Sequence, residues 1–300
     1  MSKRKFRSSI NKLTPSDPSS RKLLLLVIVL FSSCAMISTV RPVSGSSTRY
    51  RGGLRNSLEA HKLNAKQLEL VLKSLREKSG FQEIHFDEDG FLKLGDQTKF
   101  IGGSASARAL ISAAVEAKQA IDLEAHNYSS IVAFARLANT VIYQSRATGD
   151  KINVYPIEID FSDFQKLFGD KKAIAAFDIG FVVLHELGHA VLGLHDSSED
   201  SSGPGDCEEY INRIRRELNL PERQNYFAKT RTTIMATSLR KVEQAELYFA
   251  QAGTPQQGGS PQRFAVSWDA MLVGPIREGS PSLSVTVRPN KSTTASTNGQ

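Results

Sequence analysis

The pentapeptide His-Glu-Leu-Gly-His at residues 185–189 constrains this chain more than any other feature. It lies in the apolar run 177–194, which predicts one buried helix. On a helix, side chains four residues apart share a face, so His185 and His189 can offer two imidazole nitrogens to one ion. Glu186 then lies beside the ion, with its carboxylate free to take a proton from water. The pattern predicts a hydrolytic centre that holds Zn²⁺; a purely structural helix is the competing interpretation.

A catalytic zinc needs three protein ligands and one open position, so the third ligand decides the class of the site. His195 follows His185 by ten residues, the ligand spacing of the metzincins. That family places a glycine where this chain has Leu192, with Gly193 one residue late. Residues 233–235, Thr-Ile-Met, match its Met-turn only in part. His195 is therefore an alternative third ligand.

A carboxylate on the next helix would complete the site in the manner of the gluzincins. A helix is predicted over residues 208–218, with an apolar face formed by Cys207, Ile211, Ile214 and Leu218. Glu208 lies nearer this face than Glu209, which points away from it at about 100 degrees per residue. Glu208 is thus the preferred third ligand, although an acid in the first turn also suits a helix that binds no metal. Asp196 and Asp206 stay open as ligands.

A family resemblance follows from the residues after the pentapeptide. Its elements are Asn212, the Ile-Arg pair at 214–215, the Leu-Pro-x-Arg run at 220–223 and the aromatic Tyr226. With the HELGH helix and the acidic loop between them, they resemble the zincin metallopeptidase domains of bacterial type III effectors and Rhs-type toxins over residues 177–227. The resemblance implies a zincin-like fold, bound zinc and an acidic ligand at Glu208 or a neighbour.

Several polar side chains in this stretch have two interpretations. Arg213, Arg215 and Arg223 could bond an oxyanion or a substrate carboxylate, or serve as solvated surface or helix-pairing residues. Tyr226 could donate to an oxyanion or pack as an aromatic of the core. The sequence favours the structural interpretation for all four.

The N-terminus has the pattern of an export signal. Seven Lys and Arg residues lie within positions 1–22, followed by nine large apolar residues at 23–31. The apolar segment predicts either a cleaved signal or a membrane anchor, and the basic side would stay in the cytoplasm. Cys34 lies in a sequence resembling a lipobox, so lipidation is a third interpretation. Cys207 is the second cysteine and is too distant in the chain to suggest a disulfide.

Composition limits the class of partner. The formal charge of +7 comes largely from the first 22 residues, so the rest of the chain is close to neutral. Nucleic acid is therefore not an expected partner. A hydrophobic content of 40% is sufficient for a packed core.

The predicted fold class is α+β, zincin-like, with the HExxH helix beside a small mixed sheet. Residues 152–161 form an apolar strand broken by Pro156, which predicts an edge strand. This edge either holds an extended substrate or is a protected edge with no ligand. The predicted divisions are a basic region at 1–22, a signal peptide or anchor at 23–40, a linker at 41–53, one metallopeptidase domain at 54–275 and a disordered tail at 276–300.

The sequence thus predicts a zinc metallopeptidase that cleaves proteins or peptides outside the bacterial cytoplasm, either anchored to the membrane or secreted. Two other interpretations stay open. One is a membrane-anchored binding or scaffold protein with a non-catalytic HExxH helix, and the other is a secreted protease of the metzincin type.

Overall fold

A computed structural model describes residues 39–43, 51–58, 60–145, 148–198, 203–235, 240–253 and 259–274. Within these residues the fold is mixed α+β, which confirms the predicted class at that level. The helices are α1 (Ala65–Ser79), α2 (Ala105–Val115), α3 (Lys171–Ala175), α4 (Ile179–Leu192) and α5 (Gly205–Glu217). The strands are β1 (Thr39–Val43), β2 (Gly53–Asn56), β3 (His85–Phe86), β4 (Leu92–Lys93), β5 (Ala120–His126), β6 (Ala135–Leu137), β7 (Val141–Ser145), β8 (Lys151–Asp160), β9 (Phe168–Gly169), β10 (Glu222–Arg223), β11 (Lys229–Met235), β12 (Arg240–Gln251) and β13 (Gln262–Asp269).

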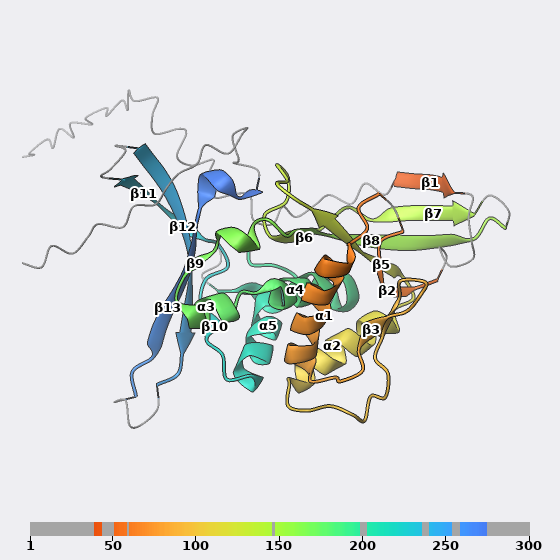
Figure 1. The fold of residues 1–300 in the computed structure, drawn as a ribbon, viewed down its shortest axis with the longest axis horizontal. Helices are drawn as coiled ribbons and strands as arrows, with labels where there is room; N and C mark the ends of the chain where they lie inside the picture. Colours follow the sequence, from red (N-terminus) through yellow and green to blue (C-terminus); the bar gives the residue numbers. More distant parts are fainter. Residues whose placement is uncertain are drawn as a thin grey trace, which may run out of the picture.

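The larger sheet has six strands in the order β1-β7-β8-β5-β2, with β6 also paired to β8. Strands β2, β5 and β8 run parallel to one another, whereas β6 and β7 run antiparallel to β8, so the sheet is mixed. Helices α1, α2 and α4 gather on one side of it (Figure 1). The face toward these helices is apolar and buried, with Ile121, Leu123, Ile157 and Ile159 in the main core.

Strand β8 corrects the prediction of an edge strand at residues 152–161. It lies inside the sheet, with β5 on one side and both β7 and β6 on the other. Pro156 is tolerated because it lies between the part of β8 paired with β7 and the part paired with β6. Its carbonyl still accepts from the N–H of Ala138 at 2.8 Å. The missing N–H therefore falls where the partner strand changes, and no ladder bond is lost.

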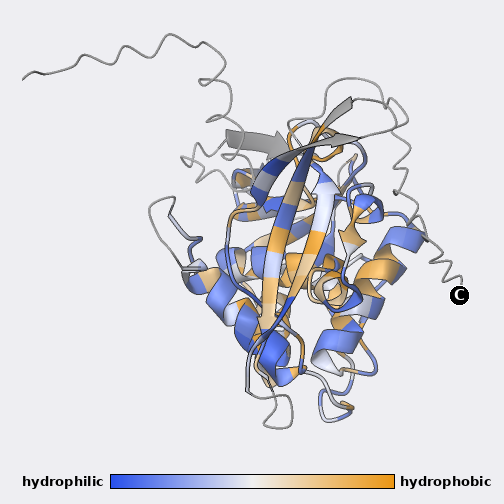
Figure 2. Ribbon diagram, turned by 90° about the vertical axis from the view of Figure 1, so that its left-hand side faces the viewer, coloured by the Kyte–Doolittle hydropathy of each residue, from blue (hydrophilic) through white to orange (hydrophobic). Residues whose placement is uncertain are grey.

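The smaller sheet is antiparallel, in the order β10-β12-β13-β9, with β11 also paired to β12. Figure 2 shows this sheet toward the viewer, with hydrophobic and hydrophilic residues alternating along its strands. The period of two places one set of side chains in the core, namely Ala245, Leu247, Phe249, Val266 and Trp268. Met235 ends strand β11, so residues 233–235 form a strand rather than a turn.

Local sequence signals explain the helix ends. Asn64 caps α1 through a capping box, and Gly80 ends it in the left-handed region at φ 80°. Ser104 caps α2 by accepting from the N–H of Ala107. Strands β3 and β4 pair antiparallel as a short hairpin.

Helix α4 carries the HExxH residues and contacts β6, β8, α1, α2 and α5. The two sheets lie on different sides of this helix cluster (Figure 1). At its start, the rings of Phe134, Phe177 and Trp268 pack together with centroids 5.0 to 6.4 Å apart. One continuous core thus joins both sheets to α4, which fixes the position of the site.

The ends of the chain fall outside the description. The predicted basic region at 1–22, nearly all of the predicted anchor at 23–40, Cys34 and the predicted tail at 276–300 lie beyond the described residues. The segment predicted as a linker begins within β1, which pairs in parallel with β7, and ends at the first residue of β2. Among the described residues, no helix has the length and apolarity needed to cross a membrane.

Candidate metal centre

Helix α4 is held firmly at both ends. Asp178 caps its start by accepting from the N–H groups of Gly180 and Phe181, both at 3.1 Å. The same carboxylate forms an ion pair with Lys78 of α1. Gly193 ends the helix in the left-handed conformation, φ 63°, and turns the chain back toward the site.

The two histidines of α4 point their Nε2 atoms at one carboxylate. The Nε2 atoms of His185 and His189 lie 3.1 Å apart. Oδ1 of Asp196, in the loop after the helix, lies 3.0 Å from the first and 3.1 Å from the second. Nδ1 of His189 donates to the carbonyl of Leu194 at 2.7 Å, which directs Nε2 of that ring toward the cluster. Three metal-ligating side chains therefore converge on one point.

A fourth side chain belongs to the same cluster. Ligand atoms of His185, His189, Asp196 and Cys207 all lie within 4.8 Å of one another. Cys207 is fully buried in the first turn of α5, is not in a disulfide, and its thiol donates to the carbonyl of His185 at 3.2 Å. The sequence predicts this cysteine on an apolar helix face. It does not predict that the sulfur lies beside His185 and His189.

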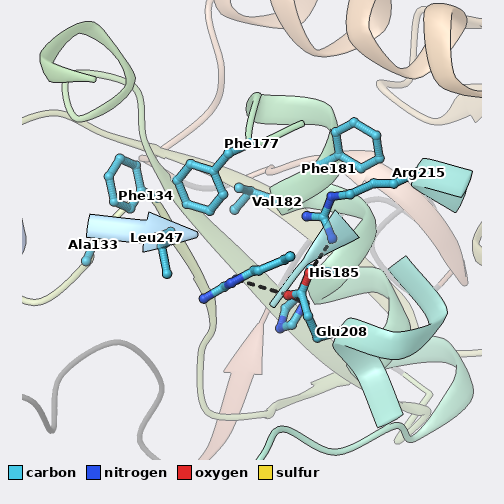
Figure 3. Close-up of a pocket in the computed structure, with 10 residues that line it drawn as sticks. Ala133, Phe134, Phe177, Phe181, Val182, His185, Glu208, Arg215 and Leu247 are labelled. Carbon is cyan, nitrogen blue, oxygen red and sulfur yellow. Dashed lines mark hydrogen bonds and ion pairs between the residues drawn. The ribbon is translucent and has the colours of Figure 1, made fainter. Parts of the chain in front are cut away.

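Glu208, the preferred third ligand from the sequence, lies on the other side of the His185 ring. Its Oε2 is 3.3 Å from Nδ1 of His185, away from the nitrogen that faces His189. Its other partners are Arg215, through Oε1, and Arg223, whose Nη1 lies 3.0 Å from Oε2. Figure 3 shows the Glu208 carboxylate beside the ring of His185. The structure thus places Glu208 to orient a ligand, while Asp196 faces both Nε2 atoms.

The two remaining alternatives do not join the cluster. The side chain of His195 is exposed, although its carbonyl accepts from the N–H of Cys207 at 3.1 Å. Asp206 is exposed on the first turn of α5. Neither residue belongs to the group of four whose ligand atoms converge.

The buried network behind His185 involves two of the three arginines. Arg215 and Arg223 are 2% and 4% exposed, which excludes the solvated-surface alternative for both and leaves a buried structural role. Asn212 accepts from Arg215 at 2.8 Å and bonds both backbone groups of Arg223. Arg213 is exposed, as the sequence suggests, and lies against the ring of Tyr210.

A small cavity borders this network. Its volume is about 20 Å³, enough for about one water molecule. Apolar side chains form most of its wall, including Phe134, Phe177, Phe181, Val182 and Leu247 (Figure 3). Because these groups exclude bulk water, the ion pairs of Glu208 lie in a weakly screening environment.

Glu186 is fully buried and is tied to strand β6. Its Oε2 accepts from the N–H of Leu137 at 2.8 Å. Since Ala138 donates back to β8, the N–H of Leu137 points away from β8, toward α4. Oε1 of Glu186 has no hydrogen-bond partner among the described residues. Burial raises the pKa of Glu186, although the charges of His185 and His189 oppose this effect.

Burial and hydrogen bonds set the pKa values of the side chains in the cluster. Burial lowers the pKa of His189, but hydrogen bonds with Asp196 and Cys207 outweigh it and bring the pKa to about 11. Burial raises the pKa of Asp196, yet its bonds to the two histidines hold that pKa below the ordinary range. The site stabilises positive charge next to Asp196, and a bound cation can take the place of the histidine protons.

Tyr226 lies over the ring of His185, with centroids 6.1 Å apart. Its side chain is buried, as expected for a core aromatic, but it also faces the site. Burial raises the pKa of Tyr226, and the nearby charge and hydrogen bond of Asp196 raise it further. The phenol therefore keeps its proton and can donate it.

These side chains fit a zinc ion. Two imidazole nitrogens, a carboxylate oxygen and a sulfur form a donor set that zinc accepts. The buried Oε1 of Glu186 is a polar atom that a water next to the ion would satisfy. Partners that would orient the two imidazole rings are also present. His189 donates to the carbonyl of Leu194, and Nδ1 of His185 lies beside the carboxylate of Glu208.

A second group of possible ligands lies on the polar face of the larger sheet. Glu124 and His126 of β5 and Glu158 of β8 have ligand atoms within 4.8 Å of one another. All three are only partly buried. Glu158 forms an ion pair with Arg136 at 2.7 Å, and the ring of His126 stacks on His61. The carboxylate of Glu158 is therefore already engaged by Arg136.

Comparisons of the chain with protein-family models, curated proteins and solved structures give no match.

Proposed function

We propose that the chain is a zinc-dependent peptidase with a zincin-like active site on α4. The observation that supports it best is the convergence of His185, His189 and Asp196 beside a buried Glu186. The types and order of the residues are those that metal-assisted hydrolysis requires. In this proposal Asp196, rather than Glu208 or His195, is the third zinc ligand.

Zinc bound here supplies a Lewis acid for the scissile carbonyl and lowers the pKa of water to about 7. Glu186 receives the proton of the attacking water and delivers it to the leaving amine. Its bond to Leu137 fixes Oε2, while Oε1 is available to the water. Tyr226 keeps its proton and donates to the oxygen that gains charge.

Strand β6 supports a peptide as the substrate. It is paired to β8 on one side, and among the described residues no strand pairs with its other side, where the N–H of Leu137 donates to Glu186. Extended peptides bind such edges by adding a strand. The substrate-binding role expected of residues 152–161 therefore passes to residues 135–137, which lie next to Glu186.

The setting of the enzyme is the bacterial envelope or its outside. The basic and apolar pattern of residues 1–40 supports export, with anchoring, cleavage or lipidation at Cys34 as the forms it can take. The resemblance to effector and toxin domains supports a protein target. Asn212, Arg215 and Arg223, which belong to that resemblance, form the network around Glu208.

The test compares the full-length chain, purified in detergent, with its Glu186→Gln variant. Both are expected to bind one zinc per chain by elemental analysis. Hydrolysis of denatured casein is expected to fall at least about 100-fold in the variant, because the general base is lost. A matched control is Glu209→Gln, an exposed residue on α5 that pairs only with Arg216 among the described contacts. Full activity in Glu186→Gln, or a wild-type chain without stoichiometric zinc, would overturn the proposal.

A further inference from the structure

Cys207 has no role in the proposed hydrolysis, yet its sulfur lies in the ligand cluster. Its side chain is fully buried, and α5 places the sulfur beside α4 rather than in the apolar core alone. The ligand atoms of Cys207, His185, His189 and Asp196 lie within 4.8 Å of one another. Ligands around a single tetrahedral zinc, at about 2.0 to 2.3 Å from it, have separations of this order.

The pentapeptide itself makes room for this sulfur. A Cβ atom at Gly188 would lie 2.9 Å from Sγ of Cys207, closer than side chains approach in folded proteins. Gly188 is in the middle of α4, where glycine costs about 1 kcal/mol relative to alanine. Its φ is not in the left-handed region, so backbone freedom does not explain it. Close approach of the thiol does.

We propose that the Cys207 thiolate is the fourth ligand of this zinc and that its sulfur controls the open position of the centre. The inference rests on the proposed zinc site. Zinc favours thiolate, and the thiol gives its proton to solvent when the sulfur binds the ion. With four protein ligands the centre is closed to substrate, because hydrolysis needs one open position.

The sulfur also has a second partner, through which the centre can open. Sγ donates to the carbonyl of His185 at 3.2 Å, so the protonated thiol has an acceptor when it is not bound to the ion. Departure from the ion requires one proton from solvent to convert thiolate to thiol. The chain thereby carries its own inhibitory group, in the first turn of α5.

Cobalt(II) is the probe that distinguishes sulfur from other ligands. A thiolate bound to Co²⁺ gives an intense charge-transfer band in the near ultraviolet, which nitrogen and oxygen ligands do not give. We expect this band when the full-length chain is titrated with Co²⁺. It should persist in Cys34→Ser, which leaves Cys207 as the single cysteine, and disappear in Cys207→Ser. Affinity for Co²⁺ should fall at least about tenfold in Cys207→Ser.

A second variant and a chemical measurement test the inference independently, in case Cys207→Ser does not fold. Gly188→Ala should displace the sulfur and weaken the band while His185 and His189 still bind Co²⁺. Zinc should slow alkylation of Cys207 by iodoacetamide at least tenfold in the Cys34→Ser chain, as followed by mass spectrometry. A Cys34→Ser chain that binds Co²⁺ without the band would overturn the inference and leave the zinc site intact. Absence of Co²⁺ binding, or binding unaffected by His189→Ala, would overturn the proposed function as well.

Discussion

The two groups of histidine and carboxylate side chains have similar compositions but different surroundings. Between α4 and α5, Glu208 is 1% exposed and meets two guanidinium groups and the His185 ring. On the sheet face, Glu124 is half-buried. Its burial raises its pKa most, and the negative charges of Asp122 and Glu158 raise that pKa further. The proposed metal centre therefore differs from the sheet face in the buried partners around its side chains rather than in their types.

The same change of carboxylate to amide should therefore act differently in the two regions. Glu208→Gln leaves Arg215 and Arg223 buried without their ion-pair partner, so we expect it to lower the free energy of unfolding by about 3–5 kcal/mol. Chemical denaturation followed by circular dichroism measures the loss. Glu209→Gln, at an exposed position on the same helix, is the control and should stay within about 0.5 kcal/mol of wild type. A loss below about 1 kcal/mol in Glu208→Gln would contradict the role assigned to the arginine network.

Zinc affinity should separate the regions in a second way. Asp196→Asn removes the carboxylate shared by His185 and His189, and we expect zinc affinity to fall at least about 100-fold. Glu158→Gln, on the sheet face, should change it by less than about twofold. Competition with a chromophoric chelator measures both. Asp206→Asn is a matched control near the centre, because its side chain is exposed. Equal losses in Asp196→Asn and Glu158→Gln would show that the sheet face holds the ion.

The features that a single sequence can predict are local. Asn64, Ser104 and Gly193 are such features, because a cap depends on residues within one turn of the helix. The placement of His185 and His189 on one face follows from the helical period alone. These outcomes need no knowledge of which elements meet in space.

The features that it missed depend on distant partners. Pro156 suggested an edge, but the pairing of β8 with both β6 and β7 decides where a missing N–H is harmless. The helical period predicts that Glu208 points inward. It does not predict that Arg215 and Arg223 form ion pairs with its carboxylate. Asp196 lies in a loop, where no periodic pattern predicts the direction of a side chain. The sequence therefore left it as one of several alternative third ligands.

A usable signal for Cys207 was nevertheless present. Gly188 is a poor helix former at an interior position, which often marks a close approach by another group. A buried cysteine on the next helix is a small side chain that could make that approach. Joining the two required the crossing of α4 and α5, which a single sequence does not specify.

The sheet face should respond to a charge change with a smaller effect of the opposite sign. A raised carboxyl pKa means that stability falls as pH rises from the ordinary range of Glu to the raised pKa, since ionised Glu124 is penalised in the fold. Glu124→Gln should therefore stabilise the protein at pH 7, by up to about 1 kcal/mol. Denaturation of this variant and of Glu69→Gln, an exposed control on α1, measures the gain. A loss above about 1 kcal/mol would mean that Glu124 has a stabilising partner comparable to those of Glu208.

An exposed carboxylate gives the smallest effect and tests whether depth of burial or the partners set the response to acid. Glu217, at the end of α5, accepts from the hydroxyls of Ser104 and Ser106, both at 2.6 Å, and so anchors α5 to the start of α2. Slight burial raises its pKa, but these bonds lower it to about 2.

Because the pKa of Glu217 is lowered, its contribution to stability is complete above about pH 4.5 and is lost as pH falls toward 2. Glu217→Gln should cost about 0.5 kcal/mol at pH 7, after allowance for solvent screening, and little at pH 2.5. Thermal unfolding at both pH values measures this, with Glu88→Gln in the exposed hairpin turn as the control. An equal cost at both pH values would show that the negative charge of Glu217 is not what stabilises the start of α2. A cost confined to neutral pH would show that hydrogen bonds to a charged carboxylate lower its pKa even at the surface, where burial is slight.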